Sequence, residues 1–255
     1  MNLVSLRVLA ESFGIGYLPV KVLKGPARGA WWSVFPYSAY WRTDGGNTWI
    51  AETIEKYGCQ PGLHCWDLGA HYGIFSVAMA RGVGPTGSVV AFEPDPVSSR
   101  RLRWHRCLNQ LDNLTCIEAA GSDHDGVARL YQYGEFGGTT SHLPFPNENV
   151  TAVPYQEICL IHLDEWFKGA DYSPPDFIKI DVEGHGNAAL EGMSSVLEEH
   201  RPVILMAFHG HDENKIGFPM LRKLGYAAED QEGQRVEELE EQKSCDLLMI
   251  PRDVH

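Results

Sequence analysis

From residue 64 onward, short apolar runs alternate with segments of helical periodicity. We expect seven of these runs to be strands: 64–68, 88–92, 114–119, 177–180, 203–208, 226–228 and 246–250. The first five runs are largely apolar, which is typical of a mostly parallel sheet whose two faces are both covered by helices. Ligands of such sheets bind at the carboxyl ends of the strands, so the chemistry is expected at that edge.

The segments between these runs carry helix signals. The helix after the first run is expected to cover 73–81 and to stop at Gly82. Asp95 is expected to cap the next helix, with Pro96 at its first position. The apolar face of that helix is expected to consist of Val97, Trp104, Leu108 and Leu111. A later helix is expected to carry one apolar stripe made of Ala189, Met193, Val196 and Leu197.

Two segments depart from the strand–helix alternation. Residues 1–50 are rich in aromatic side chains and are expected to form a cap or lid on a core that spans 51–255. The same aromatics could instead fill the core or form a subunit contact, so a homo-oligomer stays open. Residues 126–160, rich in Gly, Thr, Asn and Pro, are expected to be an irregular insertion, either a loop or a hairpin near the strand ends.

Charge and cysteine usage exclude several classes of partner. Acidic residues outnumber basic ones by 34 to 21, for a formal net charge of −13, so neither a nucleic acid nor an anionic membrane is expected. Arg7 and Glu11 interrupt the apolar N-terminus, and no apolar run is long enough to span a membrane. The six cysteines form no C-x-x-C pair and are expected to be reduced thiols of a cytoplasmic protein.

The segment from Cys65 to Ala78 predicts a ligand site. A strand ends near Asp67, and Gly69 and Gly73 then bracket a tight turn into a helix. Glycine allows close approach of a ligand, and the helix start offers unpaired N–H groups. The spacing is G-x-x-x-G and not the G-x-G-x-x-G of dinucleotide sites, which disfavours a nicotinamide dehydrogenase. A carboxylate before the turn suits a hydroxyl-bearing or cationic ligand better than a pyrophosphate.

Acidic residues recur at the ends of the next two strands. Glu93 lies 20 residues after Gly73, where an acidic side chain can accept both hydroxyl groups of a ribose. Asp123 follows the third strand and could accept a hydrogen bond from an adenine amino group. Together with the glycine turn, these residues describe an adenosine site without a phosphate site.

The motifs DLGAHYG, FEPDP, GSDHDG, IHLDEW and FIKIDVEGHG occur in this order. The series resembles the FkbM family of class I S-adenosylmethionine-dependent methyltransferases over roughly residues 40–250. The resemblance implies a Rossmann-like, twisted, mostly parallel sheet of seven strands whose last strand is antiparallel, with helices on both faces. It also implies S-adenosylmethionine as cofactor, held by Asp67, Gly69, Ala70, His71, Tyr72, Gly73, Glu93, Ser122, Asp123 and Asp181. In this arrangement Glu93 would hold the ribose, while Ser122 and Asp123 would lie at the adenine.

The candidates for the reacting end follow the fourth and fifth strands: Asp181, Glu183, His185, His209 and His211. A hydroxyl is a poor nucleophile, so a general base is useful, and histidine has the appropriate ordinary pKa of about 6.5. His209 is expected to be that base. Asp181 is expected to position the cofactor amine or the substrate, and Glu183 either to cap the following helix or to bind substrate.

The expected reaction is O-methylation of a hydroxyl on a small molecule or glycan. Methylation of an amine or a carboxyl group remains an alternative, as does a nucleotide-binding module without catalysis. No metal is expected, although His209, His211 and Asp212 could bind a divalent ion together with Asp181 or His185.

Overall fold

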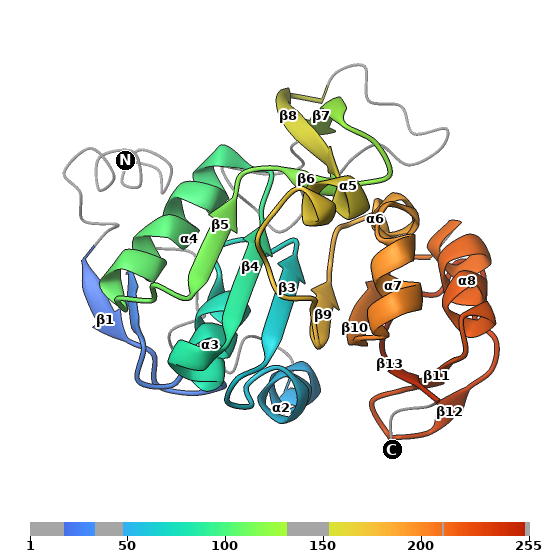
Figure 1. Ribbon diagram of the computed structural model, residues 1–255, viewed down its shortest axis with the longest axis horizontal. Coiled ribbons are helices and arrows are strands. Elements are labelled where there is room, and N and C mark those ends of the chain that lie inside the picture. The colour runs from blue at the N-terminus through green and yellow to red at the C-terminus, as the bar shows by residue number, and fades with distance from the viewer. Residues whose placement is uncertain (1–17, 34–47, 132–152, 211, 253–255) are drawn as a thin grey trace, which may run out of the picture.

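A computed structural model of the chain describes residues 18–33, 48–131, 153–210 and 212–252 (Figure 1). Its strands are β1 (Pro19–Lys21), β2 (Trp31–Ser33), β3 (His64–Leu68), β4 (Ser88–Phe92), β5 (Leu114–Ile117), β6 (Ala120–Ser122), β7 (Gly126–Tyr131), β8 (Tyr155–His162), β9 (Phe177–Ile180), β10 (Val203–Phe208), β11 (Tyr226–Glu229), β12 (Arg235–Val236) and β13 (Cys245–Pro251). Its helices are α2 (Thr48–Tyr57), α3 (Ile74–Val83), η2 (Gly84–Thr86), α4 (Pro96–Leu108), α5 (Leu163–Lys168), α6 (Gly186–Gly192), α7 (Ser194–His200), η3 (Glu213–Gly217) and α8 (Phe218–Lys223).

The main sheet has eight strands in the order β12-β11-β13-β10-β9-β3-β4-β5. Strands β5, β4, β3, β9 and β10 are parallel neighbours, and β13 runs antiparallel to both β10 and β11. The expected seven-strand sheet with an antiparallel last strand is therefore confirmed. The eighth strand, β12, is an addition of two residues that pairs with β11 at the edge.

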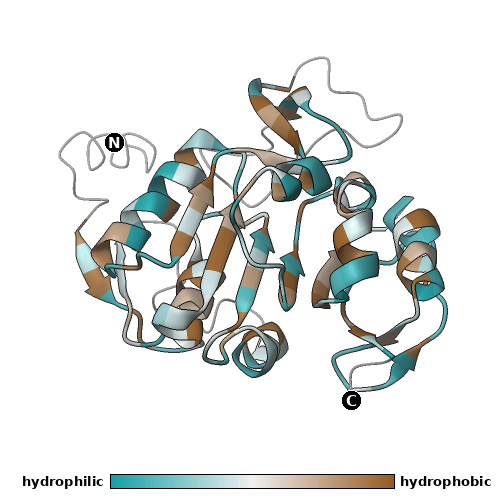
Figure 2. Ribbon diagram, in the orientation of Figure 1, coloured by the Kyte–Doolittle hydropathy of each residue, from teal (hydrophilic) through white to brown (hydrophobic). Residues whose placement is uncertain are grey.

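Helices cover both faces of this sheet, and each face has its own core. Alternate residues of one strand face opposite cores, so Cys65 packs with the side chains of α2, α3 and α4 while Trp66 packs with those of α5 to α8. All four residues of β9 are buried. Figure 2 shows the hydrophobic colour along β4, where Val89 and Val90 likewise belong to different cores. This two-sided burial is why the strand runs lack a polar face.

A second sheet of three strands, β6-β8-β7, lies beyond the end of the main sheet toward which β4 and β5 point (Figure 1). Strand β6 is parallel to β8, and β7 is antiparallel to β8. The two ends of the segment 126–160 thus form paired strands, while residues 132–152 lie outside the described ranges.

The hairpin of β1 and β2 packs against α4 through one buried histidine. Trp32 stacks on His105 with a ring-centroid distance of 3.6 Å. Ser33 N–H donates to His105 Nε2 at 3.1 Å, and His105 Nδ1 then donates to Tyr72 O at 2.8 Å. Burial lowers the pKa of His105 to about 3, so the ring is neutral. His105 therefore links the N-terminal hairpin to the glycine turn. The lid assignment of residues 1–50 remains a prediction, because 1–17 and 34–47 lie outside the described ranges.

The expected apolar face of α4 is wrong at Val97 and Trp104, whereas Leu111, just beyond the helix, is buried as expected. Val97 and Trp104 are 36% and 38% exposed, whereas the buried positions are Ser98, Ser99, Arg101, Leu102 and His105. The N-cap is confirmed, since Asp95 accepts hydrogen bonds from the backbone of Val97 and Ser98. Polar side chains that find hydrogen-bond partners inside the fold turn inward, so the buried face of α4 differs from the face that apolar periodicity predicts.

Two helix ends also differ from expectation. Helix α3 passes Gly82 and ends at Val83, where Gly84, whose φ is 66°, is the C-cap. The single helix expected through Ala189 and Leu197 is divided into α6 and α7. The division arises because the buried carboxylate of Asp164 accepts from Ser195 N at 2.8 Å and from Val196 N at 3.1 Å, which caps a new helix start.

No helix in the described part of the chain is long and apolar enough to cross a membrane. All six cysteines are free thiols. The cellular compartment remains a prediction.

Candidate active site

The glycine turn lies against the end of the neighbouring strand β9. Gly69, His71 and Gly73 have positive φ values of 77°, 52° and 85°. A Cβ atom added at Gly69 would lie 1.9 Å from the backbone oxygen of Asp181, so only glycine fits. The turn therefore brings the start of α3 and Asp181 together at the carboxyl edge of the sheet.

Glu93 braces this turn from the end of β4. The side chain is buried, its Oε2 accepts from His71 N at 2.6 Å, and its Oε1 accepts from Asp95 N at 2.9 Å. Burial raises the pKa of Glu93 to about 8, although both backbone N–H groups favour the ionised form. Each carboxylate oxygen has a second lone pair, so the expected contact with two ribose hydroxyls is chemically feasible here.

Ser122 and Asp123 form a corner at the end of β6. Ser122 Oγ donates to Asp123 Oδ1 at 3.1 Å and also lies 3.1 Å from His185 Nε2, while His124 Nδ1 lies 2.7 Å from Asp123 Oδ1. The hydrogen bond from His124 is the main reason that the pKa of Asp123 is lowered. The corner thus holds a carboxylate and a hydroxyl where the sequence predicts the adenine.

Asp67 lies inside the fold and only 1% of it is exposed. Its Oδ2 accepts from Ser76 Oγ at 2.5 Å, and its Oδ1 lies 3.4 Å from the Lys179 ammonium. The carboxylate is thus engaged by α3 and β9, and its expected contact with the cofactor remains a prediction.

Lys179 was not among the expected site residues. It lies on β9, is 4% exposed, and its ammonium is 3.5 Å from Asp181 Oδ2 as well as 3.4 Å from Asp67. Burial disfavours its charge, but the two carboxylates outweigh burial, so its pKa is raised. A lysine inside an apolar strand, in register with Asp67 on the adjacent strand, is the signal that could have revealed it.

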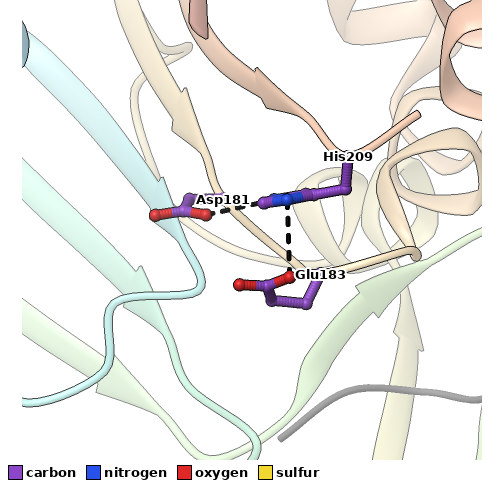
Figure 3. Close-up of side chains that lie close together, drawn as sticks. All are labelled: Asp181, Glu183 and His209. Atoms are coloured by element: carbon purple, nitrogen blue, oxygen red, sulfur yellow. Dashed lines mark ion pairs between the residues drawn. The ribbon is translucent and has the colours of Figure 1, made fainter. Parts of the chain in front are cut away.

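The end of β9 and the end of β10 bring Asp181, Glu183 and His209 together (Figure 3). His209 Nε2 lies 3.3 Å from Asp181 Oδ1, and His209 Nδ1 lies 3.4 Å from Glu183 Oε2. The side chains of the two acids are 43% and 38% exposed, and that of the histidine is 19% exposed. A partly open imidazole between two carboxylates is suited to accepting a proton from a bound molecule.

Charge within this trio favours the protonated imidazole. Burial would lower the pKa of His209, but the hydrogen bond of Asp181 and the charges of Glu183 and Glu213 outweigh burial and raise it. Burial would raise the pKa of Asp181, but Lys179 and His209 hold it well below its usual range. Burial and then the charge of Asp181 raise the pKa of Asp246.

Helix capping, one of the two roles expected for Glu183, belongs to another residue. Helix α6 starts at Gly186, and His185 at its N-cap makes no capping hydrogen bond with its side chain. The N–H of Gly186 donates instead to Glu213 Oε1 at 2.9 Å. Glu213, which sequence reasoning missed, thus takes this role, while binding of substrate by Glu183 remains a prediction.

The metal alternative involves a different set of residues from the one suggested by the sequence. In the described part of the chain, Asp181, Glu183 and His209 are the one group of three or more His, Cys, Asp or Glu residues whose ligand-type atoms lie within 4.8 Å of one another. His211 lies outside the described residues, and His185 faces Ser122. The expectation that no metal is used remains a prediction.

The cofactor implied by the sequence fits the groups that are present. A turn with close backbone approach, an acid at the end of β4 and a polar corner after β6 match the turn, ribose and adenine contacts expected of an adenosine group. The carboxylate of Asp181, beside Lys179, would face the cationic amine of the cofactor at the same edge of the sheet.

Comparison with known proteins agrees with this assignment. The sequence matches the family described as the methyltransferase FkbM domain over residues 67–241, more than half of the chain. No curated protein matches the sequence.

Several solved structures are similar in fold. Methyltransferase FkbM from Methylobacillus flagellatus KT has 17% identity and a TM-score of 0.48, with 73% of this chain and 43% of that chain covered. Precorrin-6y C5,15-methyltransferase from Geobacter metallireducens GS-15 has 17% identity and a TM-score of 0.47, with 78% and 84% covered. A SAM-dependent O-methyltransferase from Thermotoga maritima has 11% identity and a TM-score of 0.43, with 80% and 65% covered. The chain thus spans less than half the length of the Methylobacillus protein.

Proposed function

The chain belongs to the FkbM family of S-adenosylmethionine-dependent methyltransferases, and we propose that it methylates a hydroxyl group of a small molecule or glycan. One observation carries this choice of acceptor: the imidazole of His209 lies between two carboxylates at the sheet edge, beside the glycine turn. A hydroxyl needs help to lose its proton during methyl transfer, and this arrangement offers that help.

The residues that would hold the cofactor are those at the three strand ends. Glu93 would accept the ribose hydroxyls, Ser122 and Asp123 would contact the adenine, and Asp181 would face the amine. When bound, S-adenosylmethionine supplies an electrophilic methyl group on a positively charged sulfur. The protein must then align the acceptor oxygen with that methyl group.

Within the trio, Asp181 and Glu183 have different roles. Lys179 anchors Asp181, whose Oδ1 lies 3.3 Å from His209 Nε2 and favours a proton on that nitrogen. Nδ1 then takes the proton of the acceptor hydroxyl, and Glu183 stabilises the resulting imidazolium. His209 is the catalytic residue in this scheme.

The same charges disfavour a carboxyl acceptor. A carboxylate already carries the negative charge of a nucleophile and gains nothing from a base. It would also approach Asp181, Glu183 and Asp246, which repel it. A hydroxyl acceptor that is neutral at the reacting end fits this edge better.

The class of product tests the proposal. The enzyme is incubated with S-adenosylmethionine labelled with ¹³C in the methyl group and a panel of neutral sugars and polyols, amines, and carboxylic acids. We expect a labelled methyl ether, identified by the carbon chemical shift and by mass spectrometry. Labelled methyl ester or methylamine in place of an ether would contradict the proposal.

Replacement of Glu93 by alanine is expected to weaken binding of S-adenosylhomocysteine at least ten-fold, equivalent to about 1.4 kcal/mol. The substitution removes the expected ribose acceptor and the two hydrogen bonds that brace the turn. Calorimetric titration measures the effect. Glu165→Ala, at an exposed pair with Lys168, is the matched control and should bind like the wild type. Equal affinity of the Glu93 variant and the wild type would remove Glu93 from the site.

A further inference from the structure

We propose that Glu213 is a positioning residue that holds the backbone of His209 in place for proton removal, an inference that rests on the proposed function. Glu213 belongs to η3 and does not belong to the strand ends at which the sequence places the chemistry.

Both carboxylate oxygens of Glu213 accept a hydrogen bond, and the residue is buried. Only 3% of the residue is exposed. Its Oε2 accepts from His209 N at 2.7 Å, and its Oε1 accepts from Gly186 N at 2.9 Å. Two backbone N–H groups on one carboxylate are strong, geometrically defined contacts. Glu213 thereby connects the end of β10 to the start of α6.

The surroundings of Glu213 keep its side chain in one position. A Cβ atom added at Gly186 would lie 2.8 Å from Glu213 Oε1 and 2.6 Å from the Cε of Met206, so the carboxylate is closely packed. The next residue, Asn214, donates to Glu240 O at 2.6 Å and to Lys243 O at 2.8 Å. Contacts outside the trio thus fix the position of Glu213, and Glu213 in turn fixes the backbone of His209.

This link joins the two halves of the site. His209 is the residue expected to accept the proton, and His185, next to Gly186, contacts Ser122 at the predicted adenine corner. Glu213 therefore determines the distance between His209, where the acceptor would bind, and the Ser122 corner, where the adenine would bind. A displacement of about 1 Å at such a position can cost about 10²-fold in rate.

Glu213 also contributes charge. It faces His209 together with Asp181 and Glu183, and these carboxylates outweigh the burial of the ring. Loss of the Glu213 charge should therefore lower the pKa of His209, because one stabilising partner of the imidazolium is removed.

The chain offers a matched control for a purely structural role. Asp164 is also a buried carboxylate that accepts two backbone N–H groups at a helix start, from Ser195 and Val196. It contacts none of the trio in any described hydrogen bond. Glu213→Gln and Asp164→Asn each exchange one acceptor oxygen for an amide and leave one backbone N–H poorly paired.

The test is an NMR titration of ¹⁵N-histidine-labelled protein saturated with S-adenosylhomocysteine, in which the spectrum of His209→Gln assigns the His209 signal. We expect Glu213→Gln to lower the pKa of His209 by about 0.5 or more. Asp164→Asn should lose comparable thermal stability and leave the pKa of His209 unchanged. With an acceptor from the panel, Glu213→Gln should also lower kcat about ten-fold or more, with unchanged affinity for S-adenosylhomocysteine.

If Glu213→Gln and Asp164→Asn give the same pKa for His209 and the same kcat, Glu213 is only a helix cap and the proposal is overturned. Should Glu213→Gln not fold, Glu213→Asp keeps the charge but is shorter by one methylene. It should then lower kcat without lowering the pKa of His209, and wild-type kcat would overturn the proposal. Full turnover of His209→Gln would contradict the proposed function instead, so the two failures are distinguishable.

Discussion

Replacement of His209 by glutamine is expected to lower kcat by about 10²–10⁴-fold, the usual contribution of general-base catalysis. Glutamine keeps the approximate size of the ring but cannot take up a proton at neutral pH. The neighbouring Asp181 and Glu183 keep their positions at the strand ends, so affinity for S-adenosylhomocysteine should be nearly unchanged. Turnover with an acceptor from the panel and calorimetric titration measure the two quantities.

The pH dependence of kcat in the wild-type enzyme tests the same role of His209. His209 can accept a proton only when it is neutral, so kcat should rise as pH increases through its pKa. The carboxylates that face the ring raise this pKa above the ordinary value of 6.5. We therefore expect the acidic limb of kcat to lie above pH 6.5, and to disappear in His209→Gln.

A remote histidine provides the control for His209. His64 lies at the opposite end of β3, where its Nδ1 contacts Ser88 Oγ at 2.9 Å. His64→Gln should retain wild-type kcat and the wild-type acidic limb. A His209 variant that turns over as fast as the His64 variant would remove His209 from the reaction.

Replacement of Lys179 by methionine is expected to destabilise the fold by about 3–5 kcal/mol, the usual cost of removing one member of a buried ion pair. Methionine fills a similar volume, so the loss is mainly electrostatic. The Asp67 carboxylate, which is 1% exposed, would then keep Ser76 as a partner but lose its cation. Asp181 would lose its anchor as well. Urea unfolding monitored by circular dichroism measures the change.

Two further variants isolate the charge of Lys179. Lys179→Met combined with Asp67→Asn removes both the cation and the buried carboxylate, and should recover much of the lost stability. Lys215→Met removes an exposed lysine that pairs with Glu241, and should leave stability nearly unchanged because solvent screens that pair. If Lys179→Met and Lys215→Met were equally stable, the buried ion pair would not support the fold.

The strands could be predicted closely because their physical cause is local. The runs at 64–68, 88–92, 177–180 and 203–208 match β3, β4, β9 and β10 in their bounds. Each is buried between two helical layers, so most of its residues are apolar, and that pattern is visible in the sequence. Asp95 at the N-cap of α4 was predictable for the same reason, since a cap involves residues only two or three positions away.

The buried face of α4 could not be predicted, because its cause is not local. His105 turns inward since Ser33, 72 residues away, and the backbone of Tyr72 provide its partners. Apolar periodicity places Trp104 on the inward face, yet it is 38% exposed, whereas His105 is buried. Burial of a polar side chain depends on partners that only the folded chain brings close.

The sequence by itself determined the order of the strands, the glycine turn and the strand ends at which acids and histidines lie. Only the tertiary structure placed His209 between Asp181 and Glu183, set Lys179 between two carboxylates, and brought Glu213 under the backbone of His209. The reason is one of range. Periodicity and turn chemistry act over a few residues, whereas ion pairs and buried hydrogen bonds join residues from strands and helices that are distant in sequence.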